Sequence, residues 1–169
     1  MKTIKATEVL INASKRVLHW AFDYDLVYEA WEACERADVM LLFARSLRVD
    51  ERKIYLCNAK IVEKTFYDSG KLVVDYSAFG RAVKAAAEYG TGLINEEKLI
   101  EKIKEAEEIL NTETSVLALF NYQAACAMYS VGMHKIVCMI LDLSWKQHAK
   151  YAADICRKIL TEDIVFAEK

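Results

Sequence analysis

The chain contains no proline in 169 residues and only five glycines. Proline interrupts helices because its ring fixes φ and removes a backbone donor, and glycine is the other common helix breaker. Where these residues are missing, apolar side chains recur three and four positions apart, which is the spacing of one helix face. We therefore expect an all-α fold, a single-domain bundle of about six to eight helices that is mainly antiparallel because the connections are short.

The apolar spacing and the polar residues between segments set the expected helix limits. We expect helices over residues 7–20, 27–34, 39–47, 50–65, 78–87, 95–110, 115–131 and 133–160. Asp38, Asp50 and Asn95 are predicted N-caps, because their side-chain oxygens can accept hydrogen bonds from free backbone N–H groups. Residues 71–75 are compatible with an extended stretch or a helix, and residues 163–169 are expected to form a loose tail.

Two glycines mark the clearest interruption of the helical pattern. Gly90 and Gly92 stop the helix that precedes them, so a subdomain break, if the chain has one, is expected near residues 90–95. A chain of this length nevertheless has the usual size of one domain and can bury a core without disulfides or a structural metal. We therefore expect one helical domain over residues 1–169.

The charge pattern disfavours nucleic acid and membranes as partners. The formal net charge is −2 and the sequence pI is about 6.0, whereas a protein that depends on phosphate contacts usually has a basic excess or stripe. The first residues lack an apolar signal-peptide core, and the apolar stretch at 136–143 contains Asp142 and is far shorter than the roughly 20 residues of a membrane span. We expect a cytoplasmic protein.

The residue types that support catalysis or metal binding are scattered along the chain. Five cysteines form no CxxC pair, so reduced and mostly buried thiols are expected. His134 and Cys138 have a spacing that suits metal ligands, but no second pair accompanies them. His19 and His148 have no clear acidic partner in sequence, and the turn at 90–92 lacks the context of a phosphate loop. We expect no catalytic residue, no metal and no cofactor.

Aromatic side chains gather where the first two expected helices meet. They are Trp20, Phe22, Tyr24, Tyr28 and Trp31. Large aromatic side chains either fill the space between helices or, when exposed, form recognition surfaces. We favour core packing, and we regard any exposed members as the best candidates for a recognition surface.

Four motifs are more specific than these features. The run EAWEACERADVML at 29–41 resembles an A-W-x-x-C-x-R-x-D-W-M-L signature, and the segments at 49–53, 86–92 and 153–160 resemble V-D-x-R-x, A-A-x-Y-G-x-G and A-D-I-C-R-x-x-L in the same order. In this combination the chain resembles a family of uncharacterised phage- and prophage-associated helical proteins. That family is distantly similar to proposed immunity proteins of bacterial toxin systems.

The resemblance covers most of the chain from 29 to 160, with two departures. Val39 stands where the family has tryptophan, and residues 111–133 carry large apolar side chains where relatives are alanine-rich. The resemblance implies a helical protein that acts by binding, either neutralising a toxin or modulating a host or defence component. It also draws attention to Arg36, Asp38, Asp50 and Arg157, which we expect to form mainly caps and ion pairs between helices.

We therefore expect a non-enzymatic protein that binds a macromolecular partner, most simply another protein, and a homo-oligomer is compatible with the sequence. The alternative is an enzyme or small-molecule binder whose site is assembled between helices. Candidate binding residues are Trp20, Tyr24, Tyr28, Trp31, Arg36, Asp38 and Arg157. Predicted core residues, each on the apolar face of its helix, are Trp31, Met40, Leu41, Ile103 and Ile155.

Overall fold

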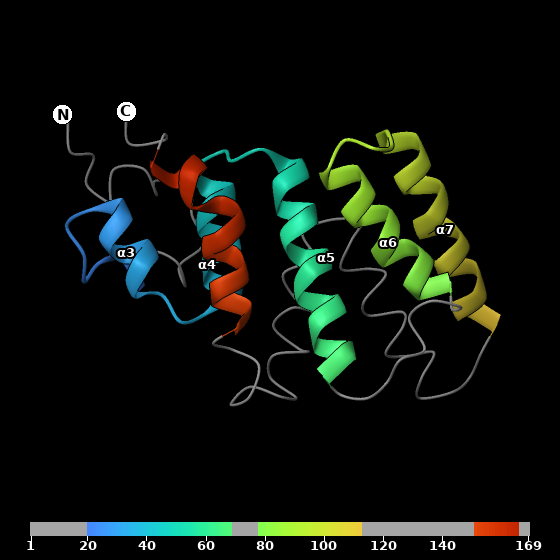
Figure 1. Cartoon of the computed structure of the whole chain (residues 1–169), viewed down its shortest axis with the longest axis horizontal. Coiled ribbons are helices and arrows are strands. Elements are labelled where there is room, and N and C mark those ends of the chain that lie inside the picture. Colours follow the sequence, from blue (N-terminus) through green and yellow to red (C-terminus); the bar gives the residue numbers. More distant parts are fainter. Residues whose placement is uncertain (1–19, 69–77, 113–150, 166–169) are drawn as a thin grey trace.

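The computed structural model describes residues 20–68, 78–112 and 151–165 (Figure 1). Every regular element among these residues is an α-helix and none is a β-strand, which confirms the expected all-α fold. The helices are α3 (Val27–Ala33), α4 (Ala37–Ser46), α5 (Glu51–Asp68), α6 (Ala78–Gly90), α7 (Glu96–Thr112) and the helix at 151–165. The helix expected at 115–131, most of those expected at 7–20 and 133–160, and residues 71–75 lie outside the described residues.

Two of the three predicted N-caps are confirmed. The backbone N–H of Arg52 donates to the carboxylate of Asp50, and the N–H of Lys98 donates to the side-chain oxygen of Asn95, both at 3.0 Å. The prediction for Asp38 is wrong, because α4 begins at Ala37 and Asp38 lies inside its first turn. Its carboxylate accepts hydrogen bonds from the Arg36 guanidinium instead, at 2.7 and 3.1 Å.

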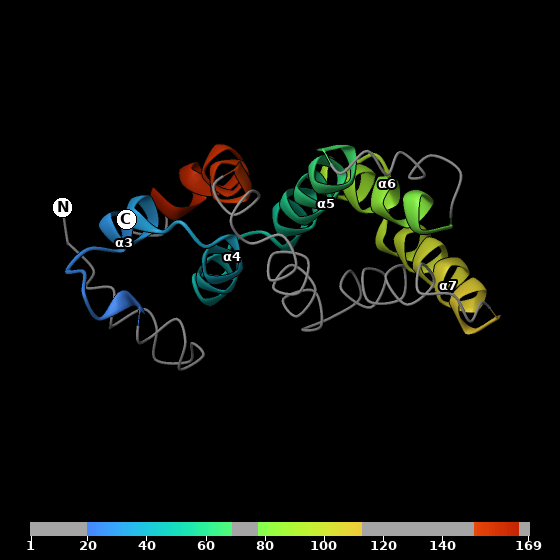
Figure 2. The ribbon, with the colours of Figure 1, turned by 90° about the horizontal axis from the view of Figure 1, so that it is seen from below.

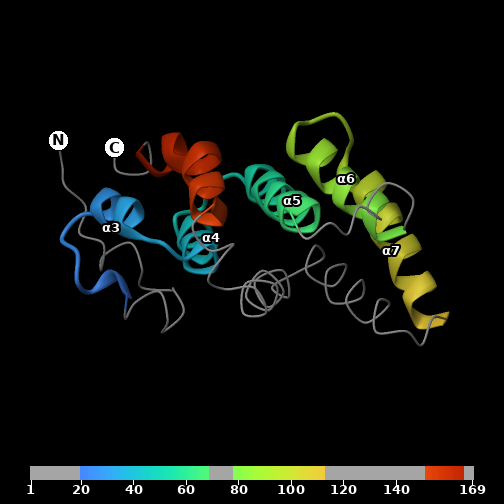
Figure 3. The same cartoon turned by 60° about the horizontal axis from the view of Figure 1, so that its bottom comes forward.

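The helices from α5 to α7 pack in sequence order, α5 against α6 and α6 against α7. They run in alternating directions (Figure 1), as the short connections predict. The helix at 151–165, drawn in red, returns to lie between α3 and α5 and beside α4 (Figures 2 and 3). It runs antiparallel to α5, so residues about 100 positions apart in sequence face one another.

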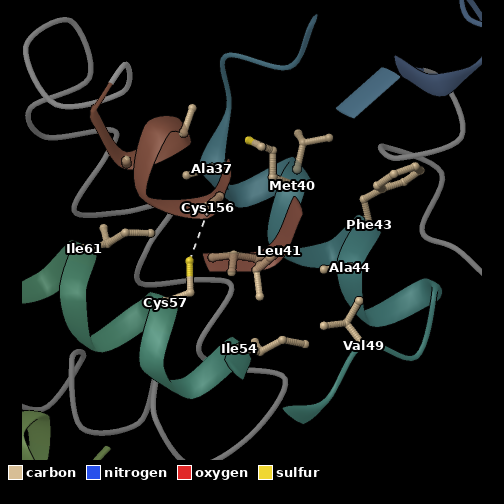
Figure 4. Close-up of a cluster of buried hydrophobic side chains, with 14 of the residues drawn as sticks. Ala37, Met40, Leu41, Phe43, Ala44, Val49, Ile54, Cys57, Ile61 and Cys156 are labelled. Atoms are coloured by element: carbon tan, nitrogen blue, oxygen red, sulfur yellow. Dashed lines mark hydrogen bonds between the residues drawn. The ribbon is translucent and has the colours of Figure 1, made fainter. Parts of the chain in front are cut away.

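A continuous apolar core joins α3, α4, α5 and the helix at 151–165 (Figure 4). Four of the five predicted core residues, Trp31, Met40, Leu41 and Ile103, are at most 5% exposed. Each large apolar side chain buried in this way contributes about 1.5–3 kcal/mol to stability. The fifth residue, Ile155, is only half-buried. It packs at the edge of the core, so its assignment to the interior is wrong.

The last described helix extends further than expected. Residues 163–165 are helical, whereas the sequence pattern predicts a loose tail from 163. Ile164 is fully buried, four residues after the equally buried Leu160. Asp163 accepts two hydrogen bonds from the Lys53 ammonium at 2.8 Å. Apolar burial and an ion pair with α5 therefore hold this turn in the helix.

The glycine turn joins two helices that pack against each other. α6 ends at Gly90, as expected, and Gly92 has φ of 78°, in the left-handed region that glycine adopts without steric cost. A Cβ on Gly90 would lie 2.5 Å from the Cβ of Leu56 and 2.8 Å from the carbonyl oxygen of Arg52. Glycine at this position therefore permits the close approach of α6 to α5.

Candidate functional site

A groove of about 740 Å³ lies between α5 and the helix at 151–165. These two antiparallel helices run side by side in all three views (Figures 1, 2 and 3). The groove is lined by Leu56, Lys60, Glu63, Lys64, Tyr151, Asp154, Ile155, Lys158 and Ile159. Cavities of a few hundred to about 1,000 Å³ with mainly apolar walls are typical of binding sites.

The apolar wall of the groove arises from a second stripe on the helix at 151–165. One face of this helix, with Ala152, Cys156 and Leu160, is fully buried in the core. The neighbouring positions Tyr151, Ile155 and Ile159 are spaced four apart, so they share an adjacent face. They are half-buried and line the groove. The helix therefore packs on α3, α4 and α5 with one face and leaves a second apolar face accessible.

The rim of the groove is charged, with three lysines and two carboxylates. Both carboxylates are paired: Glu63 accepts a hydrogen bond from Lys60 at 2.8 Å, and Asp154 accepts one from Arg157 at 2.9 Å. The Lys64 ammonium lies 5.9 Å from the centroid of the Tyr151 ring, within the range of a cation–π interaction. Each of the two rim carboxylates is therefore compensated by a cation of the chain, beside an apolar floor.

Two contacts fix the distance between the walls. At one end, the Lys53 ammonium donates to both carboxylate oxygens of Asp163 at 2.8 Å. Beneath the groove, the sulfur atoms of Cys57 and Cys156 lie 3.4 Å apart in a hydrogen bond between thiols (Figure 4). Both contacts join α5 to the helix at 151–165, so they connect the two walls of the groove.

The aromatic cluster predicted from the sequence is largely part of the packing. Trp31 is fully buried and stacks on Phe43, with ring centroids 6.2 Å apart. Trp20 packs edge-on against Phe43 at 5.5 Å and lies 5.6 Å from Tyr24. Tyr28 is 41% exposed and Phe22 is 74% exposed. The structure thus brings Trp20, Tyr24 and Trp31 together as a packed group rather than as an open surface.

The polar candidates make contacts within the chain. Arg36 forms an ion pair with Asp38, whose side chain is completely buried. Arg157 donates hydrogen bonds to the carbonyl oxygens of Cys34 at 2.6 Å and Glu32 at 3.0 Å. These carbonyls belong to the C-terminal end of α3, where backbone acceptors lack helical partners. Arg157, which lies more than 120 residues further along the chain, therefore supplies hydrogen-bond donors to the C-terminal end of α3.

The described cysteines are unsuited to nucleophilic chemistry. Cys34, Cys57 and Cys156 are free and buried, as expected. Burial, followed by the nearby Asp38 carboxylate, raises the pKa of Cys34 to about 12. Burial and the hydrogen bond with Cys57 also raise the pKa of Cys156. Both thiols are protonated near neutral pH, whereas the thiolate is the nucleophile.

The two residues with a metal-ligand spacing, His134 and Cys138, are not among the residues that the structure describes. The same holds for His19 and His148. Within residues 20–68, 78–112 and 151–165, no three histidine, cysteine, aspartate or glutamate side chains gather as metal ligands would. In the same residues, no helix combines the length and apolar character that a membrane span needs.

The groove is not predictable from the sequence alone, although some of its residues show a recognisable pattern. Ile155 and Ile159 fit the apolar stripe that predicts core residues, and periodicity does not tell which of two adjacent stripes meets a neighbouring helix. Lys60 and Lys64 are four residues apart, one turn on α5, and this spacing indicates a solvent-exposed helix face. Only the position of α5 relative to the last helix shows that these residues border one groove.

The chain matches no protein-family model, and neither a curated protein nor a solved structure shows significant similarity to it. The resemblance to phage-associated proteins therefore stays a prediction from sequence motifs. The groove provides a separate basis for a proposed function.

Proposed function

We propose that this is a non-enzymatic binding protein that holds a helix of a protein partner in the groove between α5 and the helix at 151–165. The observation that carries the proposal is an apolar groove of about 740 Å³ between two antiparallel helices. An amphipathic helix that lays its apolar face into such a groove is a recurrent mode of recognition. A third helix there would pack against both walls as in a helical bundle.

The half-buried residues of the groove favour this function. Tyr151, Ile155 and Ile159 keep apolar surface in contact with water, and removing such surface contributes about 25 cal/mol per Å². The ion pair between Lys53 and Asp163 holds the walls in place before binding, so a partner does not have to order them. Preorganisation of this kind raises affinity.

The sequence motifs suggest the setting of this interaction. A chain that resembles phage-associated and immunity-like proteins would bind a toxin or a host or defence component, and it would meet that partner in the cytoplasm. The groove supplies the surface for such binding, and the motifs supply the class of partner.

A small-molecule binder is the second candidate, and the size of the groove favours it. A volume of about 740 Å³ lies in the range of sites for compounds of drug or metabolite size. A ligand of this kind would be a mainly apolar molecule, since Leu56, Tyr151, Ile155 and Ile159 line the groove. The same groove would serve as the substrate site if the protein were an enzyme whose site is assembled between helices.

Cross-linked co-purification from cells that naturally make the protein tests the proposal. The tagged wild-type chain is compared with Ile159→Glu in the groove and with Lys104→Glu, an exposed position on α7. We expect one protein to be enriched with wild type and Lys104→Glu and to be lost with a folded Ile159→Glu variant. Equal enrichment with all three chains would contradict the proposal. A bound small molecule in native mass spectra, lost only from Ile159→Glu, would favour the second candidate.

A further inference from the structure

Two thiols of the core lie against each other although they come from distant parts of the sequence. The Sγ of Cys57 donates a hydrogen bond to the Sγ of Cys156 at 3.4 Å, and the two residues are 99 positions apart. Cys57 stands on α5 and Cys156 on the facing helix at 151–165 (Figure 4). Both side chains are free thiols and fully buried. A pair of reduced sulfur atoms therefore connects the two helices that form the groove walls.

We infer that Cys57 and Cys156 are a site of oxidative modification, at which a peroxide converts the two thiols into a disulfide bond between α5 and the helix at 151–165. A disulfide requires two cysteines whose side chains point toward each other. The hydrogen bond between the two sulfur atoms shows that this pair meets the requirement. The inference does not depend on what the groove binds.

The reaction consumes two thiols and one molecule of hydrogen peroxide. One sulfur loses its proton and attacks a peroxide oxygen, the O–O bond breaks, and the released hydroxide takes up that proton as water. The cysteine is then a sulfenic acid, which condenses with a thiol. The second sulfur attacks the sulfenic sulfur, the S–O bond breaks, and the hydroxyl group leaves with the second thiol proton as water. The thiols lose two electrons in total, and these reduce the peroxide.

Burial determines when the reaction can start. In the closed fold, burial raises the pKa of Cys156, whereas the thiolate is the reactive form. The first step therefore takes place when the two helices separate transiently and the thiols meet water, a local opening of the kind that native proteins undergo. Closure then returns the sulfenic acid to the second thiol. Oxidation is slow as a result, and a low, non-denaturing concentration of urea should accelerate it.

Cys34 provides a comparison within the same core. It is also free and buried, but its Sγ donates to the backbone carbonyl oxygen of Arg36 at 3.5 Å. A carbonyl oxygen cannot condense with a sulfenic acid to give a disulfide. Among the three described cysteines, the geometry therefore selects Cys57 and Cys156 as the pair that forms the bond.

The bond would act as a reversible clamp on the two walls of the groove. It would close a loop between residues 99 positions apart, and a cross-link over a long loop stabilises a protein by restricting its unfolded chain. In a reducing compartment, disulfides of this kind are usually transient and respond to redox conditions. The clamp would therefore form in the presence of peroxide and be released by thiol reductants.

Peroxide treatment of the full chain, followed by peptide mass spectrometry without reduction, tests the inference. We expect the peptides that contain Cys57 and Cys156 to be joined, lighter by two hydrogen atoms than the two reduced peptides together, and separable by dithiothreitol. Oxidation should raise the melting temperature of wild type and of Cys34→Ala by about 5–15 °C. Cys57→Ala has the same methionines, so it controls for methionine oxidation, and its melting temperature should not rise.

Three results of the peptide analysis would overturn the inference. They are a disulfide that joins either residue to a different cysteine, sulfinic or sulfonic acid at either residue without a cross-link, and unchanged peptides after prolonged oxidation in low urea. A cross-link that left the melting temperature unchanged would overturn the role as a clamp. The analysis of the wild type requires no substitution, so it decides the inference even if Cys57→Ala fails to fold.

Discussion

The indole Nε1 of Trp31 donates a 2.9 Å hydrogen bond to the hydroxyl oxygen of Thr161, 130 residues further along the chain. Among the residues that the structure describes, Trp31 is the largest fully buried side chain, and its ring also stacks on Phe43 of α4. One side chain of α3 thus contacts both α4 and the helix at 151–165. This contact joins α3 to the helix that forms one wall of the groove.

Replacing Thr161 by valine should lower the free energy of unfolding by about 1–3 kcal/mol. Valine keeps the shape of threonine but leaves the buried indole N–H without an acceptor, and an unsatisfied buried donor costs about that much. Urea titration of the wild type, Thr161→Val and Thr161→Ser measures the loss. The serine variant retains the hydroxyl and should lose less. If Thr161→Val remained as destabilising in a Trp31→Phe background, the hydrogen bond would not be the cause.

Alanine at Gly90 should destabilise the chain by about 1–3 kcal/mol, the usual range for overpacking. The new Cβ would meet the Cβ and backbone N of Leu56 and the carbonyl of Arg52 at 2.5 to 2.8 Å. Because two of these atoms belong to the backbone of α5, they cannot move aside without displacing that helix. Thermal unfolding monitored by circular dichroism provides the measurement, with exposed Lys84→Ala on the same helix as the control. A melting temperature equal to that of wild type would refute the close approach of α6 to α5.

The native protein should protect Cys34, Cys57 and Cys156 from iodoacetamide at pH 8. With a pKa of about 12 for Cys34, about one thiol in ten thousand is ionised at that pH. Burial also blocks the reagent. Peptide mass spectrometry after alkylation in buffer and in 6 M guanidinium should show labelling of these three residues only in denaturant. Rapid labelling of Cys34 in buffer would contradict its burial.

The ion pair between Lys53 and Asp163 should stabilise the fold up to strongly alkaline pH. The hydrogen bond to Asp163 raises the pKa of Lys53 above its ordinary value of 10.5, against the opposing effect of desolvation. Because the folded pKa exceeds the unfolded one, the contribution is complete below pH 10.5 and is lost as the pH rises through the folded pKa. The difference in melting temperature between wild type and Lys53→Met should be constant from pH 8 to 10 and shrink above pH 11. A difference that grew above pH 11 would reverse the sign of this linkage.

Local physics made the helices predictable, whereas tertiary packing decided the remaining details. The caps at Asp50 and Asn95 follow from side chains that satisfy backbone groups a few residues away. Asp38 has the same chemistry but pairs with Arg36, because burial of its carboxylate at the start of α4 requires a cation. The helical turn at 163–165 depends on Lys53 from α5, a partner that no local window contains.

The candidate site was the least predictable part. Apolar periodicity places Ile155 and Ile159 on a helix face, but whether that face is covered depends on how closely α5 approaches. For the aromatic cluster, the favoured prediction of core packing is confirmed at Trp31, which finds both a stacking partner and a hydrogen-bond acceptor inside the fold. The hydrogen bond between Trp31 and Thr161 joins residues 130 positions apart, so no local sequence pattern predicts it.

Aspartate at Ile155 and at Ile103 should have different consequences, although both residues look alike in sequence. Ile103 is 1% exposed in α7, so an unpaired carboxylate there should cost several kcal/mol, comparable with the whole stability of a domain. Ile155 is half-buried on the groove wall, where water can still solvate the new charge. We expect Ile103→Asp to abolish cooperative thermal unfolding, whereas Ile155→Asp should remain folded with a lower melting temperature and should no longer capture the natural partner. Unfolding of both variants would place Ile155 in the core and remove the apolar wall on which the groove depends.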